Sequence, residues 1–305
     1  MKRDLLTLLD LSREEILSIV SEGRRLKNLQ KRGIPHRLLE GRTVAMIFEK
    51  PSTRTRVSFE VGIAQLGATP VVLSRGEMQL GRGETVEDTA RVLSRYVDGI
   101  MIRAYSHKAV EALAAAAAVP VINGLTDATH PCQILSDLLT IEERRGGVEG
   151  MTVAYVGDGN NVAHSWILAA SRLDFTLRIG CPEGYEPDPE ILAKAPKDRV
   201  SVVNDPAAAV AGADVVYTDV WASMGQEEET EKRLRDFEGY RISPELMARA
   251  KEGAWFMHCL PAHRGQEVAA EVIDGPQSIV FDQAENRLHA QKAILAFFLG
   301  SSLEA

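Results

Sequence analysis

The segment Ser52-Thr53-Arg54-Thr55-Arg56 has the chemistry of a phosphate-binding site. Its hydroxyls are hydrogen-bond donors, and each guanidinium presents a planar fork of N–H groups that matches phosphate oxygens. The apolar residues 43–48 predict a buried strand before it, and Pro51 is typical of the first turn of a helix. The N–H groups at a helix start are unpaired and lie at the positive end of the helix dipole, so we expect an anion site here. The alternative is a capped helix with exposed arginines.

Two further places in the first half of the chain could complete such a site. His130-Pro131-Cys132-Gln133 follows a predicted strand and opens a predicted helix, so His130 could donate to a carbonyl oxygen and Gln133 could accept from an NH₂ group. Taken alone, a His-Pro pair before a helix is more often a capping or packing feature. Arg103 ends the predicted strand 99–102, at the edge where parallel sheets bind ligands, although a strand-end arginine is commonly just solvated.

The second half contains three polar turns. Gly157-Asp158-Gly159-Asn160-Asn161 resembles a dinucleotide-binding turn, but Val162 replaces the third glycine, and the alternative is an ordinary tight turn. Asp219-Val220-Trp221-Ala222-Ser223-Met224-Gly225 offers a carboxylate for an ammonium group and donors for the other end of an amino acid. In His258-Cys259-Leu260-Pro261 the cysteine could be buried filler, a metal ligand or an active-site thiol; with His263 this group still lacks a full set of metal ligands.

Together these motifs, in this order, resemble the aspartate and ornithine carbamoyltransferase family over nearly the whole chain. Residues 52–56 resemble its carbamoyl-phosphate motif and residues 130–133 its second motif, while residues 219–225 and 258–261 resemble the ornithine-specific members. The resemblance implies that carbamoyl phosphate is bound by Ser52, Thr53, Arg54, Thr55, Gln79, Arg103, His130, Gln133, Cys259, Leu260 and Arg287. It implies that ornithine is bound by Asn161, Asp219, Ser223 and Met224, and that Cys259, Arg54, His130 and Asp219 are catalytic.

The resemblance also implies an activity and an assembly. Members of this kind transfer the carbamoyl group of carbamoyl phosphate to the δ-amine of L-ornithine, giving citrulline and phosphate in arginine metabolism, and no metal or organic cofactor is implied. Gln79 lies in a glycine-rich loop that resembles the family segment reaching a neighbouring subunit's site, so a homotrimer or a multiple of trimers is expected. Carbamoyltransferases for aspartate, acetylornithine or putrescine are alternatives, as are a nicotinamide-dependent oxidoreductase and a non-catalytic phosphate-binding module.

The pattern of elements explains how these residues could be positioned. Short apolar runs alternate with helical patterns along the whole chain, which predicts α/β folding with mostly parallel sheets flanked by helices. A charged, glycine-rich stretch at 142–150 interrupts the alternation, so we expect two domains with the active site in the cleft between them. We predict a carbamoyl-phosphate domain at 1–145, joined by the C-terminal helix at about 284–305, and an ornithine domain at 150–283. The final strand is predicted at Ile279–Phe281 and the final helix at Gln283–Leu299.

Composition limits the class of protein. The chain has 305 residues and a net charge of −8, which disfavours nucleic acid and anionic lipid as partners but leaves room for a local arginine cluster. No apolar run approaches the roughly 18 residues of a membrane span, and the N-terminus does not resemble a signal peptide. The three cysteines are an odd number without metal-type spacing, so we expect a reducing, cytoplasmic location.

Overall fold

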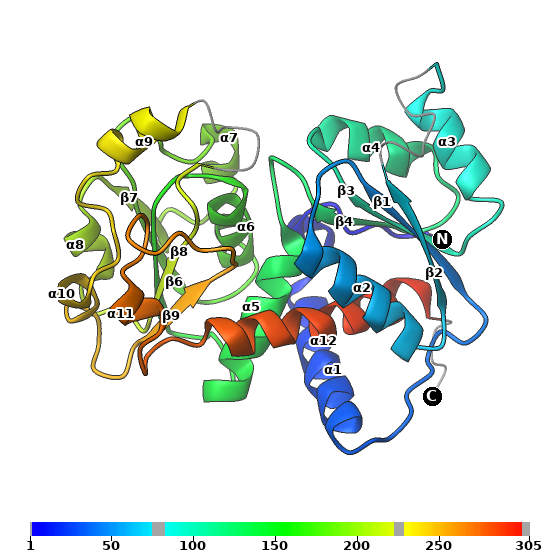
Figure 1. Ribbon diagram of the computed structural model, residues 1–305, viewed down its shortest axis with the longest axis horizontal. Helices are drawn as coiled ribbons and strands as arrows, with labels where there is room; N and C mark the ends of the chain where they lie inside the picture. Colours follow the sequence, from blue (N-terminus) through cyan, green and yellow to red (C-terminus); the bar gives the residue numbers. More distant parts are fainter. Residues whose placement is uncertain (1, 75–82, 223–228, 301–305) are drawn as a thin grey trace. The chain divides into compact units, whose positions relative to one another are not determined.

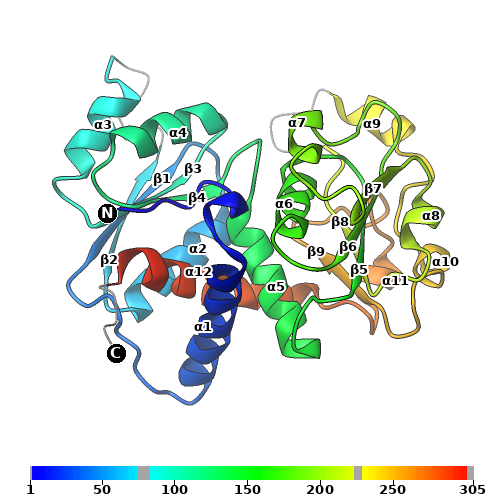
Figure 2. The ribbon, with the colours of Figure 1, turned by 180° about the vertical axis from the view of Figure 1, so that it is seen from behind.

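A computed structural model of the chain describes residues 2–74, 83–222 and 229–300 (Figure 1). The chain divides into two compact units: a first domain of Met1–Glu143 with Glu285–Ala305, and a second domain of Arg144–Ala284. Each contains one parallel sheet with helices on both faces (Figures 1 and 2). This confirms the predicted class of mostly parallel sheets flanked by helices.

The first domain is built on a four-stranded sheet with the order β2-β1-β3-β4. Its core includes apolar residues of β1 and β3 that pack against α3 and α4, while α1, α2, α5 and α12 lie on the other face (Figures 1 and 2). The elements are η1 (Leu8–Asp10), α1 (Arg13–Lys31), β1 (Thr43–Phe48), α2 (Thr53–Gln65), β2 (Thr69–Ser74), α3 (Val86–Leu93), β3 (Gly99–Arg103), α4 (His107–Ala116), β4 (Val121–Leu125), α5 (Pro131–Arg145) and α12 (Val280–Leu299), although α5 and α12 each extend a few residues into the second domain.

The second domain is built on a five-stranded sheet with the order β7-β6-β5-β8-β9. One face is covered by the apolar side chains of α8, α10 and α11, and α6 covers the other, where the Trp166 ring meets Tyr217 and Phe175 edge-on. The elements are β5 (Thr152–Val156), α6 (Asn161–Ala170), β6 (Thr176–Gly180), α7 (Pro189–Leu192), β7 (Val200–Val203), α8 (Pro206–Val210), β8 (Val215–Thr218), α9 (Thr230–Asp236), α10 (Pro244–Met247), β9 (Trp255–His258) and α11 (Ala270–Ile273).

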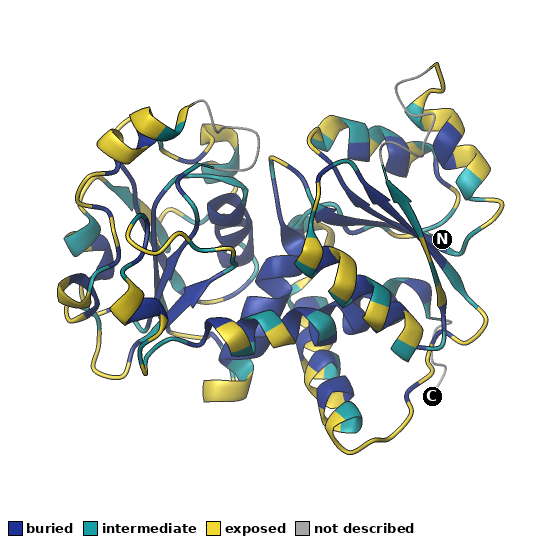
Figure 3. Ribbon diagram, in the orientation of Figure 1, coloured by how far each residue is buried: buried dark blue, intermediate teal, exposed yellow. Residues whose placement is uncertain are grey.

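The central strands of both sheets are buried on both faces. Figure 3 shows β3, β5 and β8 as almost continuously buried. Such strands read as apolar runs without alternation, which is why the strand predicted at 99–102 matches β3 to within one residue. Since all strands in a sheet are parallel, their carboxyl ends lie along one edge, and the turns that leave this edge carry the candidate site residues.

One predicted strand is wrong. Ile279–Phe281 is not a strand; Ser278 forms a single bridge to Phe256, and α12 begins at Val280. Phe281 has 69% of its surface exposed, so this short apolar run does not continue into the sheet. A run of three apolar residues carries no periodicity that separates a strand from the first turn of a helix.

Candidate active site

The first group of site residues begins at the start of α2. Ser52 has an extended backbone and caps the helix, its hydroxyl accepting from the Thr55 N–H at 3.3 Å. Thr53 is the first helical residue, so the free N–H groups and positive dipole end of a 13-residue helix lie at this motif. The local sequence therefore forms the anion-binding geometry that the residue types suggested.

Two buried arginines from distant parts of the chain converge on one hydroxyl. Arg103, at the end of β3, donates to Thr55 Oγ1 at 3.4 Å, and Arg287, on α12, donates to the same oxygen at 2.8 Å. Thr55 is fully buried and Arg287 is 4% exposed. The strand register explains the place of Arg103, because it pairs with Phe48, the residue from which β1 leaves the sheet toward the motif.

Arg54 differs from these two arginines. Within the described part of the chain, its guanidinium has no hydrogen-bond or ion-pair partner, and its Nε is buried. A buried N–H group without an acceptor is unfavourable by roughly 1–3 kcal/mol, so Arg54 is suited to an anion that would supply the missing acceptor.

His130 and Gln133 lie beside the arginines. Burial, reinforced by the charges of Arg287 and Arg103, lowers the pKa of His130 well below its usual value, so the imidazole is neutral at physiological pH. Gln133 is fully buried; its Oε1 accepts from Arg287 Nη1 at 3.1 Å, and its Nε2 donates to Asp137 at 2.8 Å. A neutral imidazole in a cationic surrounding can donate an N–H to a carbonyl oxygen without adding a further charge.

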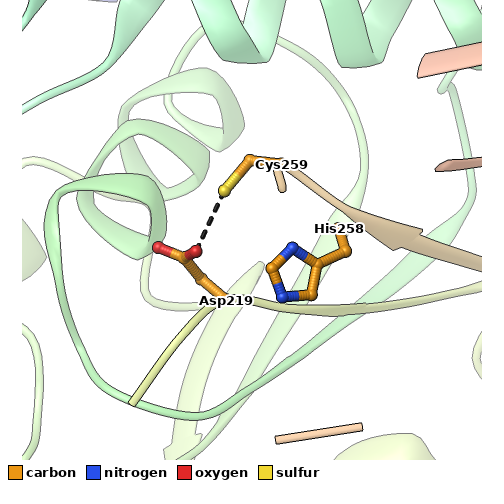
Figure 4. A group of neighbouring side chains, drawn as sticks. All are labelled: Asp219, His258 and Cys259. Carbon is orange, nitrogen blue, oxygen red and sulfur yellow. Dashed lines mark hydrogen bonds between the residues drawn. The ribbon is translucent and has the colours of Figure 1, made fainter. Parts of the chain in front are cut away.

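The second group lies on the second domain, at the ends of β8 and β9. Thr218 pairs with His258 in the sheet, so Asp219 and Cys259 leave it side by side. The Cys259 thiol donates to Asp219 Oδ1 at 3.0 Å (Figure 4). Asp219 is 7% exposed and Cys259 is partly exposed. The remaining cysteines, Cys132 and Cys181, are buried, and burial raises the pKa of each to about 12, which makes them unreactive.

The turn after β5 adds Asn160 and Asn161. Asn160 caps α6 and donates through Nδ2 to Asp219 Oδ2 at 2.8 Å, while Asn161 is the first residue of the helix. Gly157 has φ 144°, which favours glycine. A Cβ on Gly159 would lie 2.3 Å from the backbone nitrogen of Pro187, so only glycine fits. Both glycines are needed by the chain itself.

A buried pair supports the backbone that carries Cys259. His258 Nε2 lies 3.2 Å from Glu267 Oε1, and neither side chain is exposed. His258 Nδ1 accepts from the Leu260 N–H at 2.8 Å, so the ring proton must be on Nε2, facing the carboxylate. Leu260 has φ 57°, a left-handed conformation unfavourable for a residue with a side chain by about 1–2 kcal/mol. The His258–Glu267 pair holds this strained turn in place.

Asp219, His258 and Cys259 also resemble an incomplete metal site, since one potential ligand atom of each lies within 4.8 Å of the others (Figure 4). Their hydrogen bonds argue for a different use. Both His258 nitrogens have protein partners, and the Cys259 thiol donates directly to Asp219. We therefore describe the three residues as part of a hydrogen-bond network.

Arg233, on α9, links two of the turns. Its Nη1 donates to Asp158 at 3.0 Å and to the Trp221 carbonyl at 2.7 Å, and its Nε donates to Glu229. The guanidinium lies over the Tyr185 ring at 5.1 Å. Burial raises the pKa of Asp158 to about 6, while the charge of Arg233 opposes that shift. Arg233 thus ties the turn after β5 to the turn after β8.

The structure brings most predicted site residues into two groups. The first domain holds Ser52, Thr53, Arg54, Thr55, Arg103, His130, Gln133 and Arg287, and the second holds Asn161, Asp219, Cys259 and Leu260. Gln79, Ser223 and Met224 lie outside the described residues. The sequence reasoning missed Asn160, Asp158, Arg233 and Glu267, whose importance comes from burial and partners; only the position of Asn160, directly before α6, could have signalled a helix cap.

The fold and the two groups of residues match one class of enzyme. Residues 3–143 match the family model of the aspartate/ornithine carbamoyltransferase carbamoyl-P binding domain, and residues 149–298 match that of the aspartate/ornithine carbamoyltransferase Asp/Orn binding domain. The chain therefore belongs to the aspartate/ornithine carbamoyltransferase family.

Within this family, the chain is similar to individual ornithine carbamoyltransferases along nearly its full length. The chain is 56% identical over 302 residues to the ornithine carbamoyltransferase of Syntrophus aciditrophicus, covering 98% of this chain and 100% of that one. It is 56% identical over 304 residues to the anabolic ornithine carbamoyltransferase of Pyrococcus furiosus, covering 98% and 96%. The solved structure of the Pyrococcus furiosus ornithine carbamoyltransferase superimposes with a TM-score of 0.94 at 55% identity, covering 98% of this chain and 97% of that chain.

The helices of the described residues are too short or too polar to span a membrane.

Proposed function

We propose that this protein is an ornithine carbamoyltransferase, which transfers the carbamoyl group of carbamoyl phosphate to the δ-amine of L-ornithine and releases citrulline and phosphate. The observation that carries the proposal is the convergence of Arg103 and Arg287 on the buried Thr55 hydroxyl, at the start of α2. Two buried cations around a neutral group, at a helix N-terminus, suit a doubly charged phosphate. The identity to ornithine carbamoyltransferases along nearly the full chain supports the choice of second substrate.

The first domain would bind and polarise carbamoyl phosphate. Arg54, Arg103, Ser52, Thr53 and Thr55 would hold the phosphate oxygens, whose charge increases as the leaving group departs. Arg54 would gain the acceptor that its buried Nε lacks among the described residues. Such preorganised donors stabilise a transition state strongly because they need no reorganisation during the reaction.

The carbamoyl carbonyl would lie against His130, Arg287 and Thr55, which act as an oxyanion hole. His130 is neutral because burial and the adjacent arginines lower its pKa, so it acts as an N–H donor rather than an acid. Gln133 would accept from the carbamoyl NH₂, since its amide oxygen has two lone pairs and uses one for Arg287. Gln79 of a neighbouring copy would complete the same half-site.

The second domain would bind ornithine. Asp219 suits an ammonium group, and Asn161, Ser223 and Met224 would bind the amino-acid carboxylate, with Asn161 at the positive end of α6. The Cys259 thiol and the Leu260 backbone would lie beside the reacting amine and the carbamoyl group. These two residues belong to the second domain, so the proposal requires the amine to be delivered from one domain to the carbamoyl group held by the other.

The proposed reaction needs only the two substrates. The lone pair of the neutral δ-amine attacks the carbamoyl carbon, forming a C–N bond and a tetrahedral oxyanion. The oxyanion collapses, the bond between the carbamoyl carbon and the oxygen bridging to phosphorus breaks, and phosphate leaves with that oxygen and the electron pair. The nitrogen loses one proton to solvent or to the departing phosphate, which leaves citrulline.

Two observations weigh against a nicotinamide-dependent oxidoreductase. Val162 is buried in α6 where the third glycine would be, and the space next to Gly159 is filled by the backbone of residues 185–187 rather than left for a pyrophosphate. A direct test of the proposal is the carbamoylation rate with ornithine, acetylornithine, putrescine and aspartate side by side. Citrulline formation with ornithine as the fastest reaction supports it, and a faster reaction with another amine would reassign the substrate.

We also propose an oligomeric state, a cellular location and a metabolic role for the protein. The family resemblance supports a homotrimer or a multiple of trimers, a cytoplasmic location and a role in arginine metabolism. Light scattering should give a mass at least three times that of the 33.4 kDa chain. A monomer with full activity would contradict a site that needs Gln79 of a neighbouring copy.

A further inference from the structure

Asn160 has an unusually complete set of hydrogen bonds for a turn residue. Its Oδ1 accepts from the backbone N–H groups of Val162 at 2.9 Å and Ala163 at 3.3 Å, and lies 3.1 Å from the Tyr155 hydroxyl. Its Nδ2 donates to Asp219 Oδ2 at 2.8 Å. One side chain thus caps a helix and contacts the carboxylate at the centre of the second-domain site.

The orientation of this amide is dictated by its partners. Backbone N–H groups can only donate, so they require the amide oxygen on the helix side. Burial raises the pKa of Tyr155 well above its usual value, with Asp219 and Asp158 adding to the shift, so the hydroxyl remains protonated and also donates to Asn160. The amide NH₂ must then face Asp219, because the flipped amide would oppose donors to donors.

The orientation of the Asp219 side chain is also set by its partners. Its Oδ2 accepts from Asn160, and its Oδ1 accepts from the Cys259 thiol. Each oxygen therefore has its own donor, which fixes both oxygens in direction. The chain of donors runs from Tyr155 through Asn160 to Asp219, and from Cys259 to Asp219.

We propose that Asn160 is a positioning residue that holds the Asp219 side chain oriented for the amino-acid substrate, with Tyr155 fixing the Asn160 amide for this role. The inference rests on the proposed function for the identity of the substrate, but the hydrogen-bond network itself does not depend on it. Asn160 acts through Asp219 and has no contact with the reacting atoms in this account.

Two substitutions separate this role from helix capping. Asn160→Ser keeps a good capping hydroxyl but is too short to donate to Asp219. Asn160→Asp keeps the capping oxygen and the length but replaces the NH₂ with a second carboxylate oxygen facing Asp219. A control is Asp205→Ala, which removes the cap of α8 on the same domain, where Asp205 accepts from the Ala207 N–H at 2.8 Å.

We expect Asn160→Ser to raise KM for ornithine by about 10- to 100-fold, the size of a lost hydrogen bond to a charged group, and to leave KM for carbamoyl phosphate within about twofold. Asn160→Asp should raise KM for ornithine at least as much, because it replaces the donor that faces Asp219 with an acceptor. Tyr155→Phe should raise KM for ornithine only about threefold, since the helix N–H groups still orient the amide. Asp205→Ala should lower Tm without changing either KM.

A folded Asn160→Ser variant with the parental KM for ornithine would overturn the proposal, and so would the same KM change in Asp205→Ala. A readout that needs no enzyme activity is the alkylation of Cys259 by iodoacetamide, because Cys132 and Cys181 are buried. In Asn160→Ser the Asp219 side chain loses the donor on Oδ2 and with it the fixed direction of Oδ1 toward the thiol, so the alkylation rate should change several-fold. An unchanged alkylation rate refutes the positioning role, whereas absence of citrulline formation by the parent refutes only the proposed function.

Discussion

The two groups of site residues solve opposite electrostatic problems. In the first domain, buried arginines meet neutral side chains: Arg103 and Arg287 donate to the Thr55 hydroxyl, and His130 is kept uncharged. In the second, the central group is acidic, and Asp219 accepts from Asn160 on one oxygen and from Cys259 on the other. The first group gathers cationic side chains around the Thr55 hydroxyl, whereas in the second a carboxyl group is surrounded by neutral donors. The comparison suggests that the first half-site supplies catalytic electrostatics and the second supplies selectivity.

The largest expected effect tests selectivity in the second domain. We expect ornithine to be preferred over putrescine by about 10⁴–10⁵ in kcat/KM, because putrescine lacks the carboxylate and leaves the donors near Asn161 unpaired. Asn161→Ala and Ser223→Ala should reduce this ratio, while Asn204→Ala, whose amide donates to the Cys181 carbonyl elsewhere in the domain, should not. Equal rates for the two amines in the parent would remove the contrast between the domains.

The next effect tests the electrostatics of the first domain. Arg54→Ala should lower kcat/KM by about 10²–10⁴ with an unchanged Tm, since the guanidinium has no protein partner in the described residues and stabilises only the bound anion. Arg91→Ala is the control, because Arg91 is exposed and pairs with Asp88 on its own helix. Near-parental kinetics in a folded Arg54→Ala variant would show that phosphate binds elsewhere.

A smaller effect should follow from weakening the support of the Cys259 turn. In Glu267→Gln an amide replaces the carboxyl group that contacts His258 Nε2 and accepts from the His263 N–H. We expect about a tenfold rise in KM for ornithine and a loss of about 1–3 kcal/mol in the free energy of unfolding. Urea unfolding and steady-state kinetics measure the two effects. Glu271→Gln, an exposed change on α11, should alter neither; if it matches Glu267→Gln, the buried pair has no special role.

The smallest effect concerns pH and stability. The pKa of Asp158 in the fold, about 6, lies above its ordinary value of 3.8, so the folded state favours the protonated carboxyl. Its stabilising contribution is complete below about pH 4 and is lost as pH rises through 6. The Tm of the parent relative to Asp158→Asn should therefore fall between pH 4 and 7, by roughly a few degrees.

Asp236 provides a control of opposite sign. Its hydrogen bonds with Lys232 and Tyr185 lower the pKa of this exposed carboxyl, so its contribution is present at neutral pH and is lost as pH falls. The Tm of the parent relative to Asp236→Asn should rise with pH, and by less, because solvent screens the pair. Parallel slopes for the two substitutions would contradict the assignment for Asp158.

The sequence predicted the fold well where local pattern and burial agree. The strand Thr43–Phe48 has the predicted bounds, and the strand predicted at 99–102 is β3, which extends one residue further to Arg103. The failure at Ile279–Phe281 and the unpredicted short helices α7 to α11 have a common cause. A segment of three to seven residues is too short to show helical periodicity, and its conformation is decided by the packing around it.

The candidate site also contains residues that the sequence could predict and residues that it could not. Residues at the ends of parallel strands could be grouped from the sequence alone, as Asp219 and Cys259 show. Glu267 and Arg233 could not, because a single acidic or basic residue in a polar segment is normally solvated. Only the fold shows that Glu267 is fully buried against His258 and that Arg233 joins Asp158 to the Trp221 carbonyl.

The first domain consists of two separate segments of the chain, and this affects when it can fold during synthesis on the ribosome. Domains generally fold in the order in which they are synthesised, but here the first domain is interrupted after Glu143 and resumes at Glu285. A nascent chain that has emerged as far as Ala284 contains every residue of the second domain, whereas its first domain still lacks most of α12. Lys292 of α12, which is buried and hydrogen-bonded to Gln30, His36 and Gln65, has not yet been synthesised. Arg287, which donates to Thr55 in the folded domain, is also missing. The domain that begins translation is thus the last to be completed, and its anion site forms only in that final step.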